Sequence, residues 1–260
     1  MQFLIPLLAR ILVPASRILI YIFFGIFASI VWLLRFLKMD KLPEPIKMIF
    51  KVFFWGMLVT LPVFAVEYGS AYAITKSGLP SFWATIIYWF LAIALIEEVF
   101  KYLVVKSKAL KIPAFDEPTD AMIYMIVAAL GFAALENILY LLPPAEKIFS
   151  LNELFVRTAV ISFFRFIGAT FLHALCSGLV GYFLAISLRK KNSGPILVFT
   201  GILLATLLHG LYNYSIMEIA LPLKYIIPTI ILLGLNLFII IGFKKLRKME
   251  SICPVRSLKN

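Results

Sequence analysis

The chain has 260 residues, of which 63% are hydrophobic and 15% are charged. Soluble globular domains carry about 25% charged residues, so this composition excludes that class, and it also excludes disordered and collagen-like chains. The net charge is +12, but the basic residues flank apolar stretches, which is typical of membrane proteins. We therefore expect lipid as a partner and no nucleic acid.

Seven apolar stretches are long enough for a helix to cross the hydrocarbon core, which takes roughly 20 residues. We expect an all-α fold, a polytopic integral membrane helical bundle. The predicted spans are 18–34, 52–68, 82–105, 121–142, 154–188, 196–217 and 225–243. Span 154–188 exceeds what a bilayer needs, so its first part is expected to lie along the surface or to protrude. The predicted organisation is an interfacial helix at 1–17, a transmembrane domain at 18–243 and a basic cytoplasmic tail at 244–260.

The distribution of basic residues between alternate loops predicts the orientation of the bundle. Of the 25 basic residues, 17 fall in one set of loops and the tail, 6 fall on the other side, and Lys101 and Arg165 lie within spans. Cytoplasmic loops carry the excess of Lys and Arg. We therefore expect the N-terminus outside and the C-terminus in the cytoplasm of a multi-pass cell-membrane protein.

Five ionisable residues lie inside the predicted spans, far from either interface. They are Glu97, Glu98, Lys101, Glu136 and Arg165. Each such residue costs roughly 2.5–3.5 kcal/mol at the centre of a membrane helix. The five together cost on the order of 15 kcal/mol, as much as the net stability of a whole domain. Such a set indicates a function.

Glu97 and Lys101 are spaced i, i+4 and share one helix face, and Glu98 lies about 100° round the helix. They could form a structural ion pair, or a carboxylate pair suited to general-base work or metal binding. Glu136 could hydrogen-bond Arg165 or Lys101 across helices, or take part in catalysis itself.

The only two histidines, His173 and His209, both lie in predicted spans, and Asn213 follows His209 by one turn. Single buried histidines usually serve helix packing, but two that face intramembrane acids favour a site. His173 could also pair with Cys176 in a metal site, although a buried cysteine is usually a packing residue.

Depth along the helices tests whether these groups can meet. Glu136 and His173 lie 15 residues, and His209 lies 13 residues, from the predicted cytoplasmic ends of their spans. At about 1.5 Å per residue, all three lie roughly 20–22 Å deep. Glu97 is only 8 residues from its span end, so we expect that helix to continue through about Lys111.

Four blocks of the sequence carry a family resemblance. They are EEVFK (97–101), GFAALEN (131–137), His173 followed by small residues, and HGLYN (209–213). In this order, on successive spans, they resemble PrsW, a prokaryotic family of intramembrane proteases related to CAAX prenyl endopeptidases. Lys101 and Ala169 stand where the CAAX branch tends to have arginine and phenylalanine, which favours the PrsW branch.

The resemblance implies hydrolysis of a peptide bond in a membrane-anchored protein substrate, for example an anti-sigma factor. It assigns the catalytic site to Glu97, Glu98, His173 and His209, with Asn213 as a supporting match. Lys101, Glu136 and Arg165 are expected to support the site.

Two mechanisms stay open on the sequence. In the metal-free version, Glu97 activates water, His173 positions it, and His209 and Asn213 stabilise the oxyanion. In the other version, Zn2+ is bound by His173, His209 and Glu97. Two alternative functions remain: a proton-coupled transporter that uses Glu, Lys and His as a relay, and a non-enzymatic scaffold.

Overall fold

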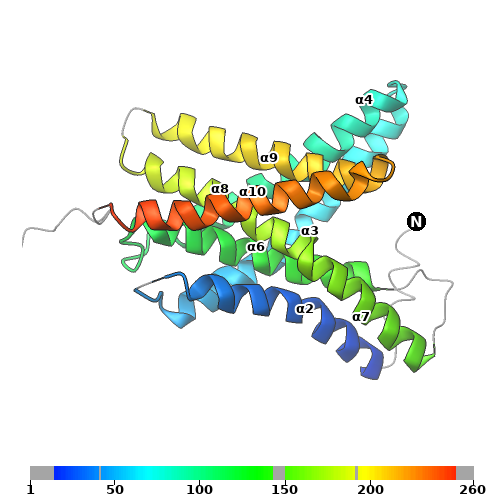
Figure 1. Ribbon diagram of the computed structural model, residues 1–260, viewed down its shortest axis with the longest axis horizontal. Helices are drawn as coiled ribbons and strands as arrows, with labels where there is room; N and C mark the ends of the chain where they lie inside the picture. The colour runs from blue at the N-terminus through cyan, green and yellow to red at the C-terminus, as the bar shows by residue number, and fades with distance from the viewer. Residues whose placement is uncertain (1–14, 41, 143–149, 191–192, 250–260) are drawn as a thin grey trace, which may run out of the picture.

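The computed structural model describes residues 15–40, 42–142, 150–190 and 193–249, and within these ranges every regular element is a helix (Figure 1). The elements in chain order are α2 (Ala15–Leu37), α3 (Ile46–Lys76), α4 (Ser81–Ile86), η1 (Ile87–Leu95), α5 (Ile96–Lys108), α6 (Pro118–Leu141), α7 (Leu151–Ile167), α8 (Ala169–Ser187), α9 (Gly194–Glu218) and α10 (Leu223–Leu246). Seven helical segments in the described ranges are long and apolar enough to cross a membrane. The predicted all-α polytopic bundle is confirmed.

Several predicted boundaries differ from the observed ones. The proposed interfacial helix at 1–17 lies mostly outside the described residues, and its last three residues belong to α2. The helix that carries Glu97 does continue past residue 105, but it ends at Lys108 rather than near Lys111. There the Ala109 N–H still bonds the Val105 carbonyl, and the chain then turns away.

The long predicted span 154–188 is two helices, because the chain breaks at Gly168 between α7 and α8. A Cβ atom at residue 168 would lie 2.4 Å from the hydroxyl oxygen of Tyr212 and 2.9 Å from the Phe164 carbonyl oxygen. Only glycine fits so close to α9 without a shift. The break therefore lets α7 and α8 follow different directions, and α8 enters the centre of the bundle.

Helix α6 runs through the middle of the bundle and is buried along nearly its whole length (Figure 1). It packs closely on α3 through two glycines: a Cβ at Gly131 would lie 2.0 Å from the Phe53 carbonyl oxygen, and one at Gly56 would lie 2.2 Å from that of Ala128. Small residues of this kind let membrane helices approach closely. Helix α8 packs on another side of α6, so α3, α6 and α8 form the core.

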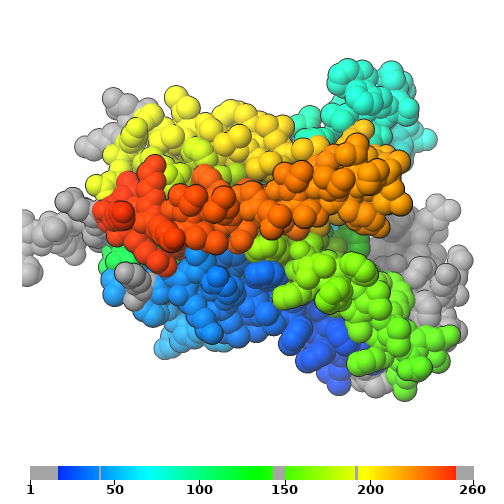
Figure 2. All heavy atoms as spheres, in the orientation of Figure 1, coloured from blue at the N-terminus to red at the C-terminus, as the bar shows by residue number. Residues whose placement is uncertain are grey.

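The outer helices expose large apolar side chains. Phe23, Phe54, Phe163, Ile196 and Leu233 are each more than half exposed, as expected for surfaces that face lipid. Figure 2 shows α10 lying across one face of the bundle between α9 and the pair α2 and α7. The loops after α2, α5 and α8 lie at the same end as the end of α10 (Figure 1), in agreement with the predicted alternation of basic loops. Which side of the membrane this end faces remains a prediction.

One irregular segment leads directly to the predicted site. Residues Ile87–Leu95 form a π-helix, η1, which continues into α5 at Ile96. A π-helix is rare, is frequently found at functional sites, and changes which side chains face a given neighbour. Here it ends at Leu95, just before Glu97 and Glu98 on the first turn of α5.

Candidate active site

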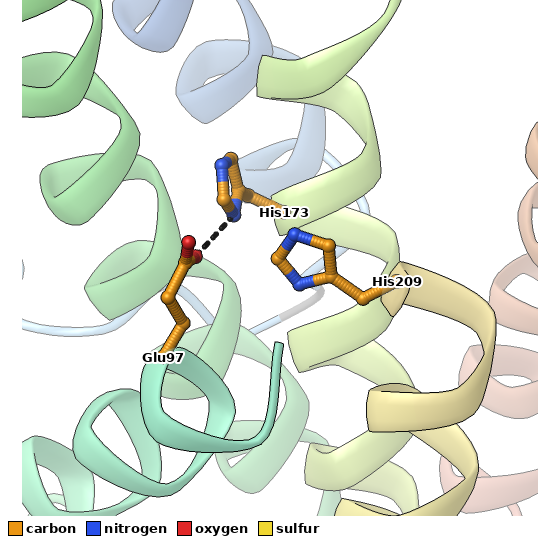
Figure 3. Close-up of side chains that lie close together, drawn as sticks. All are labelled: Glu97, His173 and His209. Atoms are coloured by element: carbon orange, nitrogen blue, oxygen red, sulfur yellow. Dashed lines mark ion pairs between the residues drawn. The ribbon is translucent and has the colours of Figure 1, made fainter. Parts of the chain in front are cut away.

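The intramembrane charges and both histidines converge at one place, where α5, α6, α8 and α9 meet. Figure 3 shows Glu97 from α5 facing the ring of His173 from α8, with the ring of His209 from α9 beside them. The centroids of the two imidazole rings are 5.1 Å apart. An oxygen of Glu97 lies 3.5 Å from Nδ1 of His173. The predicted meeting of these groups is confirmed by the geometry.

Lys101 lies at the centre of the cluster and is fully buried. Its ammonium group donates hydrogen bonds to Oε2 of Glu97 at 3.0 Å, to Oε1 of Glu98 at 2.9 Å and to Nδ1 of His173 at 2.8 Å. An ammonium group has three donors and no acceptor, so all three protons are used. Lys101 therefore holds both carboxylates and one imidazole in fixed positions.

Glu98 is completely buried and links α5 to two other helices. Its Oε1 atom accepts a hydrogen bond from Nδ1 of His209 at 3.0 Å, and its Oε2 atom accepts one from the hydroxyl of Ser177 at 3.1 Å. Because Nδ1 of His209 faces a carboxylate, it carries the proton, and the Nε2 atom of that ring is left for other partners. The adjacent acids thus differ: Glu98 orients His209, whereas Glu97 faces the cavity described below.

A second network holds His173 from the other side. The Nδ1 atom accepts from Lys101, so Nε2 carries the proton and donates to Oε2 of Glu136 at 2.8 Å. The same oxygen accepts from Nη2 of Arg165 at 2.7 Å, and Nε of Arg165 donates to Asn137. Of the two partners proposed for Glu136 from the sequence, Arg165 is the one that bonds it. Glu136 therefore links the ring of His173 to Arg165, and their supporting role in the site stays a prediction.

A cavity of about 600 Å³ lies against this cluster. Among the predicted residues, Glu97, Glu136, Arg165, His173, His209 and Asn213 line it, whereas Glu98 and Lys101 lie behind its wall; the rest of the wall is largely aromatic and aliphatic.

The helix segments that surround the cavity are the later parts of α3, α6 and α9 and the beginnings of α5 and α8, together with η1 and α7. Tyr68, Tyr140, Phe164 and Met217 line it and are each more than half exposed. The cavity therefore reaches the surface of the bundle, away from the end that carries most basic residues.

The residues fit a divalent metal by type and spacing. Glu97, His173 and His209 each offer a ligand atom, and the three atoms lie within 4.8 Å of one another. Two imidazoles and a carboxylate are a known ligand set for catalytic zinc. Ligating histidines usually donate their second N–H to a carboxylate, and Glu136 and Glu98 provide this for His173 and His209.

One feature of the cluster opposes a metal at the same position. Nζ of Lys101 bonds Nδ1 of His173 and Oε2 of Glu97, so an ion bound to these atoms would have to displace the ammonium group. Lysine and metal thus compete for the same lone pairs. The alternative pairing of His173 with Cys176 is not among the metal-capable groups in the described part of the chain; Cys176 is a buried free thiol.

The sequence prediction missed one acidic residue of the site. Glu67 on α3 is 8% exposed and lines the cavity beside Glu97. The sequence does not indicate Glu67 because the predicted span ends at residue 68, which places Glu67 at the membrane interface, whereas α3 continues to Lys76. The hydrogen-bonding residue Ser177 was also missed, because it is a small polar residue that no charge pattern distinguishes.

Comparison with known proteins agrees with this geometry. Residues 44–241 match the PrsW family of intramembrane metalloproteases. The chain is 29% identical over 194 residues to Protease PrsW of Oceanobacillus iheyensis, covering 75% of this chain and 81% of that protein. It is 26% identical over 210 residues to Protease PrsW of Bacillus subtilis, covering 80% and 85% respectively. No solved structure matches the chain. A family match over most of the chain identifies this multi-pass bacterial membrane protein as a member of the PrsW family of intramembrane proteases.

Proposed function

We propose that this protein is an endopeptidase that hydrolyses a peptide bond in a membrane-anchored protein, for example an anti-sigma factor. The observation that carries the proposal is the position of Glu97, His173 and His209 together in the wall of a largely apolar cavity that reaches the bundle surface. A segment of a substrate span can enter such a cavity from the membrane, and water can be activated at its polar end.

Glu97 is the proposed general base. Its carboxylate takes a proton from water, and the resulting hydroxide adds to the carbonyl carbon of the scissile bond. The protonated Glu97 then donates this proton to the leaving nitrogen, so that one water is consumed and one carboxyl and one amine are formed. Lys101 and His173, which contact Glu97, keep its carboxylate in position.

Asn213 and His209 are proposed to stabilise the oxyanion. Both line the cavity and are one helical turn apart on α9. The amide of Asn213 donates a hydrogen bond directly, and Nε2 of His209, which the Glu98 carboxylate holds in place through Nδ1, donates a second one when both ring nitrogens carry a proton. Donors that are fixed before the reaction stabilise the developing charge without reorganisation. Glu98 therefore acts through His209 and does not contact the substrate.

When bound by Glu97, His173 and His209, zinc would supply a Lewis acid and a water of lowered pKa. Glu98 and Glu136 would then keep the imidazole rings oriented through the same hydrogen bonds that they make now. The contribution of these two acids is thus common to both mechanisms.

The test uses purified protein in lipid vesicles with a single-span model substrate, and mass spectrometry to identify the products. Glu97→Gln and His209→Ala are expected to lower the cleavage rate at least about a hundredfold, as typical for loss of a general base or an oxyanion donor. Glu153→Gln is the matched control, because Glu153 is an exposed residue that caps α7, and it should cleave at the wild-type rate. Cleavage by Glu97→Gln at the control rate contradicts the proposal.

A further inference from the structure

Glu67 is an acidic residue of the cavity for which the network described above gives no role. It projects from α3, is nine-tenths buried and lines the cavity. Its side chain lies against that of Glu97, and Glu136 is a further acidic neighbour. The Oε1 atom is buried, and no hydrogen-bond donor in the described part of the chain reaches it.

The other three acids of the cluster are all provided with donors. Glu97 accepts from Lys101, Glu136 accepts from Arg165 and His173, and Glu98 accepts from three side chains. A buried polar atom without a partner is unfavourable, and most such atoms in proteins are paired. The Oε1 atom of Glu67 is therefore left unsatisfied by the network, whereas a ligand that brings a donor into the cavity would satisfy it.

The chemistry of an intramembrane substrate indicates what that donor is. A substrate helix must unwind around the scissile peptide bond before water can reach the carbonyl carbon. Unwinding removes the helical hydrogen-bond partners of the backbone N–H groups there. In hydrocarbon these groups have no water to bond, so they require acceptors from the protein. Around the cavity, Asn213 and Arg165 offer donors, while the α3 wall carries Glu67, whose buried Oε1 atom has no partner in the described part of the chain.

We propose that Glu67 binds the unwound backbone of the substrate by accepting a hydrogen bond from an N–H group close to the scissile bond. The inference rests on the proposed proteolytic function and adds a substrate-binding residue to it. Glu67 thereby orients the peptide from the α3 wall of the cavity, with the scissile carbonyl between Glu97 and the donors of α9.

The experiment combines variants of Glu67 with backbone changes in the substrate. Glu67→Leu removes the acceptor, Glu67→Gln keeps a carbonyl oxygen, and Val66→Leu, on the exposed neighbouring residue, is the matched control. Single-span peptides carry one amide-to-ester change each, which removes one N–H, at successive positions around but not at the scissile bond. Both kcat and KM are measured in vesicles.

Loss of one hydrogen bond corresponds to about a tenfold change. One ester position should therefore lower kcat/KM of the wild type about tenfold and have no further effect on Glu67→Leu. Glu67→Leu should raise KM about tenfold with kcat nearly unchanged, and Glu67→Gln should recover most of the loss. Equal ester effects in the wild type and in Glu67→Leu at every position would overturn the inference, as would failure of Glu67→Gln to recover binding.

Equilibrium binding of the same labelled peptides to the Glu98→Gln background separates this inference from the proposed function. Glu98 does not line the cavity, so the Glu67 contact should persist there. An ester effect that depends on Glu67 supports the inference even if the wild type does not cleave, and its absence opposes the inference even if cleavage is normal. If Glu67→Leu does not fold, Glu67→Met serves as the second acceptor-free variant.

Discussion

Lys101→Met tests whether the buried ammonium group holds the site together. Lys101 is fully buried and makes three contacts of 2.8–3.0 Å with Glu97, Glu98 and His173. Methionine keeps most of the volume of lysine but leaves two carboxylates without their nearest cation. Removing one partner of a buried ion pair costs about 3–5 kcal/mol, whereas a single side-chain hydrogen bond in a membrane protein is worth about 0.6 kcal/mol on average.

We therefore expect Lys101→Met to lower the free energy of unfolding by about 3–5 kcal/mol, a large part of the 5–15 kcal/mol of an ordinary domain. A carboxylate that loses its cation can take up a proton, and this keeps the loss of stability from becoming larger. The free energy of unfolding is measured on the purified protein in mixed micelles that contain increasing fractions of a denaturing detergent. Lys106→Met is the control, because Lys106 is exposed on the same helix, and it should change stability by less than about 0.5 kcal/mol.

A double-mutant cycle assigns the effect to the ion pair. Lys101→Met combined with Glu98→Gln should cost at least about 1.5 kcal/mol less than the sum of the two single changes, because each variant removes the same contact. A loss below about 1 kcal/mol for Lys101→Met, close to the value of an ordinary membrane hydrogen bond, would refute the reasoning. Additivity of the two changes within about 0.5 kcal/mol would show that the lysine acts elsewhere.

Three further changes have defined outcomes. Gly56→Ala places a Cβ atom against the backbone of α6 and should lower the melting temperature by an amount equivalent to about 1–3 kcal/mol. The control is Gly69→Ala on the same helix, whose Cβ atom would have no neighbour within contact distance, and which should be neutral or stabilising. Equal effects of the two changes would contradict the close packing of α3 on α6. Arg165→Lys keeps the charge but loses the planar, two-point contact with α6, so peptide cleavage should slow about tenfold or more; an unchanged rate would argue against its positioning role. Lys101→Met should bind Co2+ more tightly than the wild type, with visible absorption typical of tetrahedral cobalt that His209→Ala abolishes; equal affinity in the wild type would show that lysine and metal do not compete.

The seven spans and most charged members of the candidate site follow from sequence alone for an energetic reason. Apolar stretches of sufficient length have no stable alternative to membrane helices. Charges within them are so unfavourable that residues such as Glu97, Lys101 and Arg165 had to be paired or functional. The sequence does not determine the pairings themselves, because spacing along one helix gives the face of a side chain but not which helix lies opposite.

Only the tertiary structure decided how the parts of the site are divided. The adjacent acids Glu97 and Glu98 are equivalent in sequence, yet one faces the cavity and the other orients His209. They lie about 100° apart around α5, and α5 packs on both α8 and α9. Glu67 was hidden, since its helix extends beyond the apolar stretch that predicted it. The break at Gly168 depends on the approach of Tyr212 from another helix. Local composition determines which residues enter the membrane, and helix packing over long sequence separations determines which of them meet.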